Sequence, residues 1–350
     1  MADLPKPAYR VSQLVEGARC WLPRFVYYLR ATHGWLSRDL RVGYLPEYIS
    51  IELTNVCNFK CVFCPQSSPT HLRAVGRSFL TLERAELLLS RIREAGVQSR
   101  LIHLTLDGEP FMNRQFHKIC EIALRWGFTE MDFATNGVLC GVNRLQELPY
   151  TARYRLGIDY CADREYFERV RGTPGSWERI RRNLLEALEN DELNHIRFCL
   201  KDISSFSITD PKERQIRSVH LKELFPKNPR LSFATKTFHN ATGLVKGRGL
   251  RSKRYYVCPY PWAILNIASN GDVVACSRDL QRKTVLGNLL SQPLEEIWNG
   301  LPMQALRRNL RDRKPELSVA CAGCDMPYDG SKYTVRNLLS AARGRLQLLN

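Results

Sequence analysis

The sequence predicts an α/β fold in which parallel βαβ units form a closed or partial barrel. Two observations support this prediction. Strand-like apolar segments alternate with amphipathic helix-like segments from about residue 49 to residue 236. After about residue 250 this alternation stops and a hairpin-like pattern follows. With 350 residues and 44% hydrophobic composition, the chain can bury one large core and a smaller second one.

The first 46 residues form an arm with apolar and aromatic positions at near-helical spacing among arginines: Trp21, Phe25, Tyr28 and Leu29. We expect this arm to pack on the main domain, and peripheral membrane contact is the alternative. No apolar segment is long enough to span a bilayer, and the N-terminus lacks the apolar core of a secretion signal. We therefore expect a cytoplasmic protein.

The barrel elements follow in order. A strand over 49–53 leads into a cysteine-rich loop, and a helix begins after the N-cap Thr81 and ends at Gly96. Further strands are predicted over 101–106, 131–135, 155–160, 196–200 and 230–236, with helices over 113–127 and 175–191. In such barrels the chemistry lies at the carboxyl ends of the strands.

The C-terminal region has a different pattern. Residues 262–277 predict two strands joined by a turn at Asn270-Gly271, followed by a short helix over 294–300 and the segment "CAGC" at 321–324. The predicted divisions are an arm over 1–46, a barrel over 47–250, a small domain over 251–330 and a basic tail over 331–350.

The formal charge of +17 favours an anionic partner. Basic residues concentrate at 244–256 and again at 307–314, and we interpret both runs as solvated surface. Such an anionic partner could be a phosphate-bearing substrate, an electron-donor protein, nucleic acid or a membrane surface. We do not expect nucleic acid to be the partner.

Twelve cysteines without an export signal indicate metal binding or catalysis rather than disulfides. Cys57, Cys61 and Cys64 lie within eight positions, directly after the first strand. A structural zinc site requires four ligands, and neither Cys nor His follows until His71. A [4Fe-4S] cluster held by three thiolates instead keeps one iron open for a substrate or cofactor.

This Cys-x3-Cys-x2-Cys segment resembles the cluster motif of the radical S-adenosylmethionine (SAM) enzymes. The resemblance implies that the amino and carboxylate groups of SAM chelate the open iron. It also implies reductive cleavage of SAM to a 5'-deoxyadenosyl radical, which abstracts hydrogen from the substrate.

Motifs at later strand ends extend the resemblance. "LDGEP" at 106–110 resembles the family's Gly-Gly-Glu-Pro element, with Asp107 in place of the first glycine. "ATNG" at 134–137 and "GIDYCAD" at 157–163 resemble the elements that end the third and fourth strands, although Gly157 stands where the family has serine. Each motif alone could be an ordinary turn. The resemblance implies SAM-binding roles for Phe63, Gly108, Glu109, Pro110, Asn136 and Asp159.

A second set of cysteines comprises Cys258, Cys276, Cys321 and Cys324. Their spacing alone permits zinc or an iron-sulfur cluster. Their surroundings resemble the C-terminal extension called SPASM, or twitch in its shorter form, and the spacing is similar to that of a twitch-bearing aminocyclitol dehydrogenase. The resemblance implies one fully ligated auxiliary [4Fe-4S] cluster that transfers electrons.

Two of the remaining cysteines are candidate catalytic residues. Cys161 ends the fourth strand and Cys199 lies in the fifth, near the expected substrate, so either thiol could donate a hydrogen atom to a substrate radical. Both could instead be inert barrel-lining residues. Cys120 lies at helical spacing with Phe116 and Ala123, which indicates a core position.

The resemblance therefore implies a partial (β/α)6 TIM-like barrel followed by a twitch/SPASM domain. We expect a dehydrogenase that oxidises a carbinol carbon of a sugar-like or aminocyclitol-like molecule. The resemblance also implies a small-molecule substrate of anionic or sugar-like character and a flavodoxin- or ferredoxin-type electron donor. Epimerisation with a cysteine as hydrogen donor is the first alternative, and radical modification of a peptide is the second. A pure electron-transfer or structural metal protein would have no use for the Gly-Glu-Pro and Thr-Asn-Gly elements.

Overall fold

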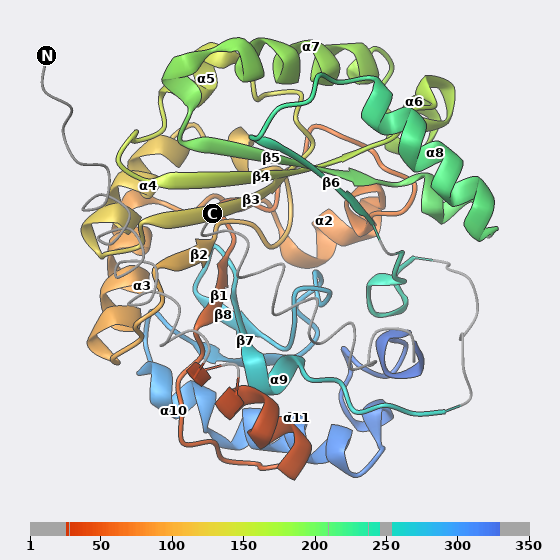
Figure 1. Cartoon of the computed structure of the whole chain (residues 1–350). Helices are drawn as coiled ribbons and strands as arrows, with labels where there is room; N and C mark the ends of the chain where they lie inside the picture. The colour runs from red at the N-terminus through yellow and green to blue at the C-terminus, as the bar shows by residue number, and fades with distance from the viewer. Residues whose placement is uncertain (1–25, 28, 209, 237, 246–253, 330–350) are drawn as a thin grey trace, which may run out of the picture.

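The computed structural model describes residues 26–27, 29–208, 210–236, 238–245 and 254–329. The strands of these residues form one sheet in the order β6-β5-β4-β3-β2-β1-β7-β8-β9 (Figure 1). The strands are β1 Tyr48–Ile51, β2 Leu101–His103, β3 Glu130–Thr135, β4 Arg153–Tyr160, β5 Ile196–Asp202, β6 Leu231–Thr235, β7 Ile264–Ile267, β8 Asp272–Val274 and β9 Val285–Asn288.

The first six strands are parallel, as the βαβ rhythm predicts. The sheet curves, and its two ends, β6 and β9, do not pair with each other in the described part of the chain. The fold is therefore a mixed α/β structure with a largely parallel, incompletely closed barrel sheet.

Helices connect the strands and cover the outer side of the sheet (Figure 1). Thr81 begins α3 as predicted, because its hydroxyl accepts a hydrogen bond from the backbone N–H of Arg84 at 3.3 Å. The helices are α2 Pro69–Val75, α3 Leu82–Glu94, α4 Phe116–Arg125, α5 Val142–Gln146, α6 Arg164–Arg171, α7 Ser176–Glu189, α8 Pro211–Glu223, α9 Tyr260–Ala263, α10 Leu294–Trp298 and α11 Leu301–Arg311. None of the helices described has both the length and the apolar character needed to cross a bilayer.

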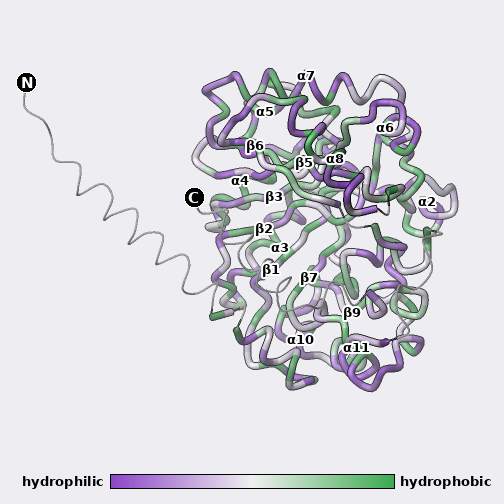
Figure 2. Tube along the Cα trace, turned by 45° about the vertical axis from the view of Figure 1, so that its right-hand side comes forward, coloured by the Kyte–Doolittle hydropathy of each residue, from purple (hydrophilic) through white to green (hydrophobic). Residues whose placement is uncertain are grey.

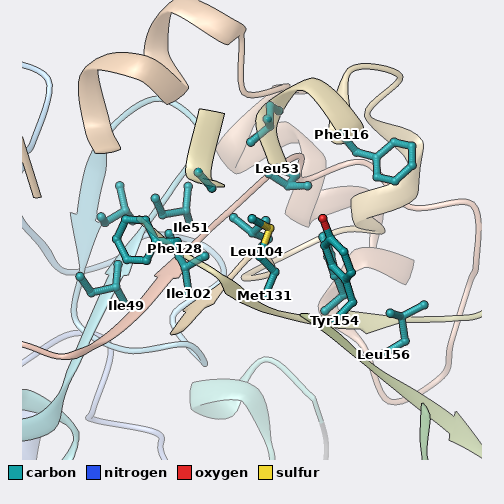
Figure 3. Packing of buried hydrophobic residues seen from close by; sticks show 14 of the residues in the cluster. Ile49, Ile51, Leu53, Ile102, Leu104, Phe116, Phe128, Met131, Tyr154 and Leu156 are labelled. Carbon is teal, nitrogen blue, oxygen red and sulfur yellow. The ribbon is translucent and has the colours of Figure 1, made fainter. Parts of the chain in front are cut away.

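Alternation along the strands separates two faces of the sheet. On the outer face, Ile49, Ile51, Ile102, Met131 and Leu156 pack into the hydrophobic core with residues of the covering helices (Figure 3). Along the helices α7 and α11, hydrophilic and hydrophobic residues alternate, as expected of helices with one face on the core (Figure 2).

The inner face of the sheet, here called the concave face, carries the alternate residues of the same strands. In β4, Leu156 and Ile158 belong to the core, whereas Arg155, Gly157 and Asp159 lie on the concave face. Polar residues therefore line the inside of the barrel, where branched apolar residues usually dominate.

The predicted C-terminal hairpin is confirmed, with Gly271 at φ +88° in the turn between β7 and β8. The sequence pattern did not predict how this hairpin attaches to the barrel. The strand β7 pairs in parallel with β1 from Tyr48 to Ile51, so the hairpin extends the barrel sheet.

The described part of the arm packs on the C-terminal region. The indole N–H of Trp35 donates to the carbonyl of Val257 at 3.0 Å, and the hydroxyl of Tyr44 donates to the carbonyl of Trp262 at 2.8 Å. Residues 1–25 and 28 lie outside the described residues, and so do 246–253 in the first basic run and the tail over 331–350.

One residue of the second basic run corrects our expectation of a solvated surface. The Arg307 side chain is fully buried, and its guanidinium donates to the carbonyls of Pro261 and Leu40 at 3.0 and 2.8 Å. It also lies over the ring of Trp298, 4.8 Å from the centroid. This arginine therefore joins the arm to the helices α9 and α10 instead of facing water.

Candidate cluster and cofactor site

The first cysteine set lies in the loop that follows β1. The backbone N–H of Phe59 donates to the sulfur of Cys57 at 3.4 Å, and the N–H of Cys64 donates to the carbonyl of Cys61 at 3.1 Å. Charges on Cys57, Cys61 and Cys64 would each raise the pKa of Arg171, so the three thiols lie within electrostatic range of one cation.

Arg171 is a candidate site residue that the sequence reasoning missed. It is the last residue of α6, it is buried, and its guanidinium lies 5.0 Å from the ring centroid of Phe59. The next residue, Gly172, has φ +63°, and a Cβ there would lie 2.4 Å from the carbonyl oxygen of Lys60. This close approach holds the end of α6 against the cluster loop.

The buried thiols suit a positively charged iron-sulfur core, because burial without such a core disfavours their thiolate forms. Burial raises the pKa of Cys57 to about 12, and burial also raises the pKa of Cys61 and Cys64. Iron would stabilise their thiolates. No three or more Cys, His, Asp or Glu side chains in the described ranges are arranged to hold a single metal ion. Cluster thiolates bind separate irons, so three thiols in one loop can hold a cluster without forming such a single-ion site.

Glu109 connects the Gly-Glu-Pro segment to the Thr-Asn-Gly segment. Its carboxylate accepts a hydrogen bond from the hydroxyl of Thr135 and another from the backbone N–H of Asn136, both at 2.7 Å. Burial raises the pKa of Glu109, although these hydrogen bonds oppose the shift. The side-chain amide of Asn136 in turn donates to the Asn58 side chain at 2.7 Å, so the two motifs are joined to the cluster loop.

Gly108 requires the absence of a side chain. It has φ +67°, and a Cβ there would lie 2.4 Å from the carbonyl oxygen of Thr54, which follows β1. Pro110 follows as the first residue of a 3-10 turn over Pro110–Met112. The backbone of this motif therefore lies directly against the segment that leads to Cys57.

Asp159 lies on the concave face between two cations. Its carboxylate is 3.0 Å from the ammonium of Lys236 and 3.4 Å from the guanidinium of Arg171. Burial would raise the pKa of Asp159, but Lys236, Arg171 and Lys201 outweigh burial and hold the pKa below its usual range. The side chain is therefore a carboxylate at neutral pH.

Two further predicted residues lie near this carboxylate. Gly157, which replaces the family's serine, leaves room for Lys201, because a Cβ there would lie 2.7 Å from the Lys201 ammonium nitrogen. Phe63 packs edge-on against Phe206, with ring centroids 4.9 Å apart, and lies 5.7 Å from the guanidinium of Arg171.

The structure places the two candidate catalytic cysteines differently. Cys161 is completely buried in the hydrophobic core, where its thiol donates to the carbonyl of Asp163 at 3.3 Å. Cys199 is partly exposed on the concave face, between Gly157 and Ser232 in the strand register. Only Cys199 of these two shares a face with Asp159 and Lys201.

The second cysteine set lines one cavity. Cys258, Cys276, Cys321 and Cys324 surround it together with apolar side chains and Arg278. The sulfur of Cys276 accepts from the backbone N–H of Arg278 at 3.4 Å, and the guanidinium of Arg278 is 3.2 Å from Asp325. Burial raises the pKa of Cys276 and Cys321. Four thiols around one enclosed space fit a fully ligated cluster.

Two family models match the chain. The model of the radical SAM superfamily matches residues 51–196, and the model of SPASM, an iron-sulfur cluster-binding domain, matches residues 258–325. The protein is therefore an iron-sulfur protein with two cluster-binding regions. The chain belongs to the radical SAM superfamily and carries a C-terminal SPASM domain.

Curated relatives match part of the chain. A probable GTP 3',8-cyclase of Sulfurisphaera tokodaii is 27% identical over 198 residues, which cover 53% of this chain and 58% of the relative. A probable GTP 3',8-cyclase of Saccharolobus islandicus (strain M.14.25 / Kamchatka #1) is 26% identical, covering 43% of this chain and 46% of the relative. The chain thus spans about half the length of these relatives.

Solved structures with the same fold cover more of the chain. BtrN in complex with AdoMet and 2-DOIA has a TM-score of 0.55 at 17% identity, covering 80% of this chain and 93% of BtrN. AnSMEcpe with bound AdoMet has a TM-score of 0.54 at 14% identity, and the match covers 85% of this chain and 98% of anSMEcpe. Streptococcus suis SuiB bound to precursor peptide SuiA has a TM-score of 0.55 at 15% identity, and the match covers 79% of this chain and 69% of SuiB.

The cofactors follow from the two domains. The radical SAM domain implies SAM and a SAM-binding [4Fe-4S] cluster, and the SPASM domain implies an auxiliary cluster. Cys57, Cys61 and Cys64 lie in the first matched region, and the cavity with four cysteines lies in the second.

Proposed function

We propose that this radical SAM enzyme is a dehydrogenase that oxidises a carbinol carbon of a small sugar-like or aminocyclitol-like substrate. The observation that carries this proposal is the concave face. Ala134 in the central strand β3 is exposed to solvent, and its neighbours in register, Gly157 and Cys199, are small. Polar groups of Asp159 and Lys201 stand beside this space. Such a face suits a compact polar substrate.

In this proposal Cys57, Cys61 and Cys64 hold one cluster, and Cys258, Cys276, Cys321 and Cys324 hold the other. When bound, these groups and SAM supply a 5'-deoxyadenosyl radical for hydrogen abstraction and an acceptor for the second electron. The backbone at Gly108 and the side chains of Asn136 and Asp159 orient SAM. Glu109 fixes the relative position of the two loops that carry these groups.

The other predicted residues support the same arrangement. Pro110 shapes the turn after Glu109, and Phe63 offers an aromatic face next to Arg171 for the adenine. A flavodoxin- or ferredoxin-type protein delivers the first electron. The substrate binds on the concave face, beneath the loops that follow β1, β2 and β3.

An epimerase is the alternative that a specific observation favours. Cys199 faces the same side as Asp159 and Lys201, and a thiol there could return a hydrogen atom to a substrate radical. Cys161 is the weaker donor candidate, because its buried thiol is already engaged with Asp163. The fold similarity to SuiB bound to its precursor peptide keeps a peptide-modifying enzyme as a further alternative.

Turnover in D2O separates these reactions. Reconstituted protein, reductant and SAM would be incubated with aminocyclitols and sugars, beginning with relatives of the 2-DOIA bound by BtrN. We expect a product two mass units lighter than its substrate, without deuterium at the reacting carbon, and we expect Cys199→Ala to remain active. Cys161→Ala serves as the matched control. An isomeric product with one deuterium, lost in Cys199→Ala alone, would establish the epimerase instead.

A further inference from the structure

The concave face carries a polar row that crosses five neighbouring strands. In register from β1 to β5 it consists of Ser50, His103, Asp132, Arg155 and Arg197. Branched apolar residues usually fill the inner layers of such barrels. A continuous polar row in this place therefore requires a functional explanation.

The next row toward the carboxyl ends of the strands is built from small residues. Ala134, Gly157, Cys199 and Ser232 are neighbours in register across β3 to β6, and Ala134 and Ser232 are exposed. The polar row therefore lies beneath an open space, and we call this row the polar floor. The Asp159 carboxylate stands on the opposite side of that space, nearer the cluster loop.

The two acids that act on Lys201, Asp132 and Asp159, each already have two cationic or hydrogen-bonding partners. Asp132 is 3.0 Å from the imidazole of His103 and receives two hydrogen bonds from the guanidinium of Arg155. Asp159 is paired with Lys236 and Arg171. Neither carboxylate therefore needs Lys201 as a counterion.

Lys201 is a surplus cation between these two ion-pair groups. It is half-buried on β5, its ammonium lies over Gly157, and within the described residues the structure shows no hydrogen bond or ion pair of that ammonium. Arg155, Arg171, Lys201 and Lys236 outnumber the two carboxylates by two charges. A cluster with three thiolates adds about one negative charge. SAM that binds iron through its neutral amino group and its carboxylate adds about none, so an excess of about one positive charge persists in the loaded enzyme.

We propose that Lys201 anchors an anionic group of the substrate, a phosphate or a carboxylate, in the space between Gly157 and the polar floor. This inference rests on the proposed function, because it takes the concave face as the substrate site. Burial and the neighbouring Lys236 lower the pKa of Lys201, and a bound anion would stabilise its charged form. The substrate class thereby narrows to anionic polyols, such as sugar phosphates, uronic acids or nucleotides.

Competitive acetylation of the reconstituted protein tests this site without knowledge of the natural substrate. Peptide mass spectrometry would follow the labelling of Lys201 by acetic anhydride in chloride, phosphate, pyrophosphate, acetate and citrate at matched ionic strength. We expect pyrophosphate or citrate to slow the labelling of Lys201 at least fivefold relative to chloride, and to leave the exposed Lys212 unchanged. Comparing protection by phosphate and pyrophosphate with protection by acetate and citrate shows whether the site prefers a phosphate or a carboxylate. Equal labelling in all salts would overturn the proposal.

A glycine variant localises the effect. Gly157→Ala introduces a methyl group within 2.7 Å of the ammonium nitrogen and should reduce the protection of Lys201 to less than twofold. Gly141→Ala is the matched control, because its nearest neighbour is 3.9 Å away. Protection that persists in Gly157→Ala would overturn the placement of the anion.

Release of 5'-deoxyadenosine by the wild-type protein is measured in parallel. Protection without any release would contradict the radical SAM activity while supporting an anion site. Release without protection would overturn the anion site alone.

Discussion

His71 and Asp107 form a buried pair in which the imidazole Nε2 lies 2.8 Å from a carboxylate oxygen. Asp107 stands where the family's motif has its first glycine, and His71 comes from α2, which follows the cluster loop. The other oxygen of Asp107 accepts from the backbone N–H of Gly108 at 2.9 Å. Asp107, the residue that departs from the family's motif, thus has a hydrogen-bonding partner, His71, 36 positions earlier in the chain.

Replacing one member of this pair should cost more than replacing both. His71→Ala leaves the Asp107 carboxylate without its partner and should lower the free energy of unfolding by about 1–3 kcal/mol. In the double variant His71→Ala/Asp107→Ala the loss should be smaller than the sum of the single losses. Urea unfolding followed by tryptophan fluorescence measures these values, with the exposed His220→Ala as control. Additive losses would show that the two side chains are not coupled.

Gly108→Ala should be far more damaging than Gly76→Ala, although both glycines have similar φ values of +67° and +69°. Gly76 has open space around a new Cβ, so its substitution should cost only the backbone strain of about 1–3 kcal/mol at φ +69° and ψ −175°, a region that is adopted almost only by glycine. The new Cβ at Gly108 meets the carbonyl of Thr54 and should displace the cluster loop. Iron content and SAM binding by equilibrium dialysis should fall only in Gly108→Ala, and equal behaviour of the two variants would contradict this account.

Arg307→Met should destabilise the junction between the arm and the C-terminal region. The variant leaves the carbonyls of Pro261 and Leu40 without their donor, at an expected cost of about 2–4 kcal/mol. The neighbouring Arg308 is exposed, so Arg308→Met should change the free energy of unfolding little. Limited proteolysis near residue 40 should accelerate only in Arg307→Met. If both variants were cleaved alike, the buried arginine would not hold the arm.

Iron analysis should separate the two cysteine sets. Anaerobically reconstituted wild-type protein should hold about eight irons, and replacement of Cys57, Cys61 and Cys64 together by Ala should leave about four. Cys120→Ala, in the core and away from both sets, should keep the wild-type content. A C-terminal site that is colourless and filled with zinc would contradict the second cluster.

The local pattern predicted most of the strands but not all of their neighbours. The apolar residues of β1 and the turn at Gly271 are encoded within a few positions, so both could be anticipated. The pairing of β7 with β1 joins residues more than 200 positions apart, and no local signal specifies it. The strand β9 is short and partly polar, which gave it no distinct strand pattern.

The same limit applies to the candidate site. The spacing of Cys57, Cys61 and Cys64 is a local property, whereas the place of Arg171 depends on how α6 meets the cluster loop. Strand alternation does place Cys199 and Lys201 on one face of β5 and the buried Phe198 and Leu200 on the other. Cys161 follows the last residue of β4, where alternation no longer determines the direction of a side chain.

The pairing of β1 with both β2 and β7 has a practical consequence for dissecting this protein. A fragment that stopped before β7 would turn β1 from an interior strand into an edge strand and expose its unpaired backbone groups. Tyr48, Ile49 and Ile51 would then offer a β-prone template for self-association. Separate expression of the barrel should therefore yield aggregates, so each half is best studied through point substitutions in the full-length chain.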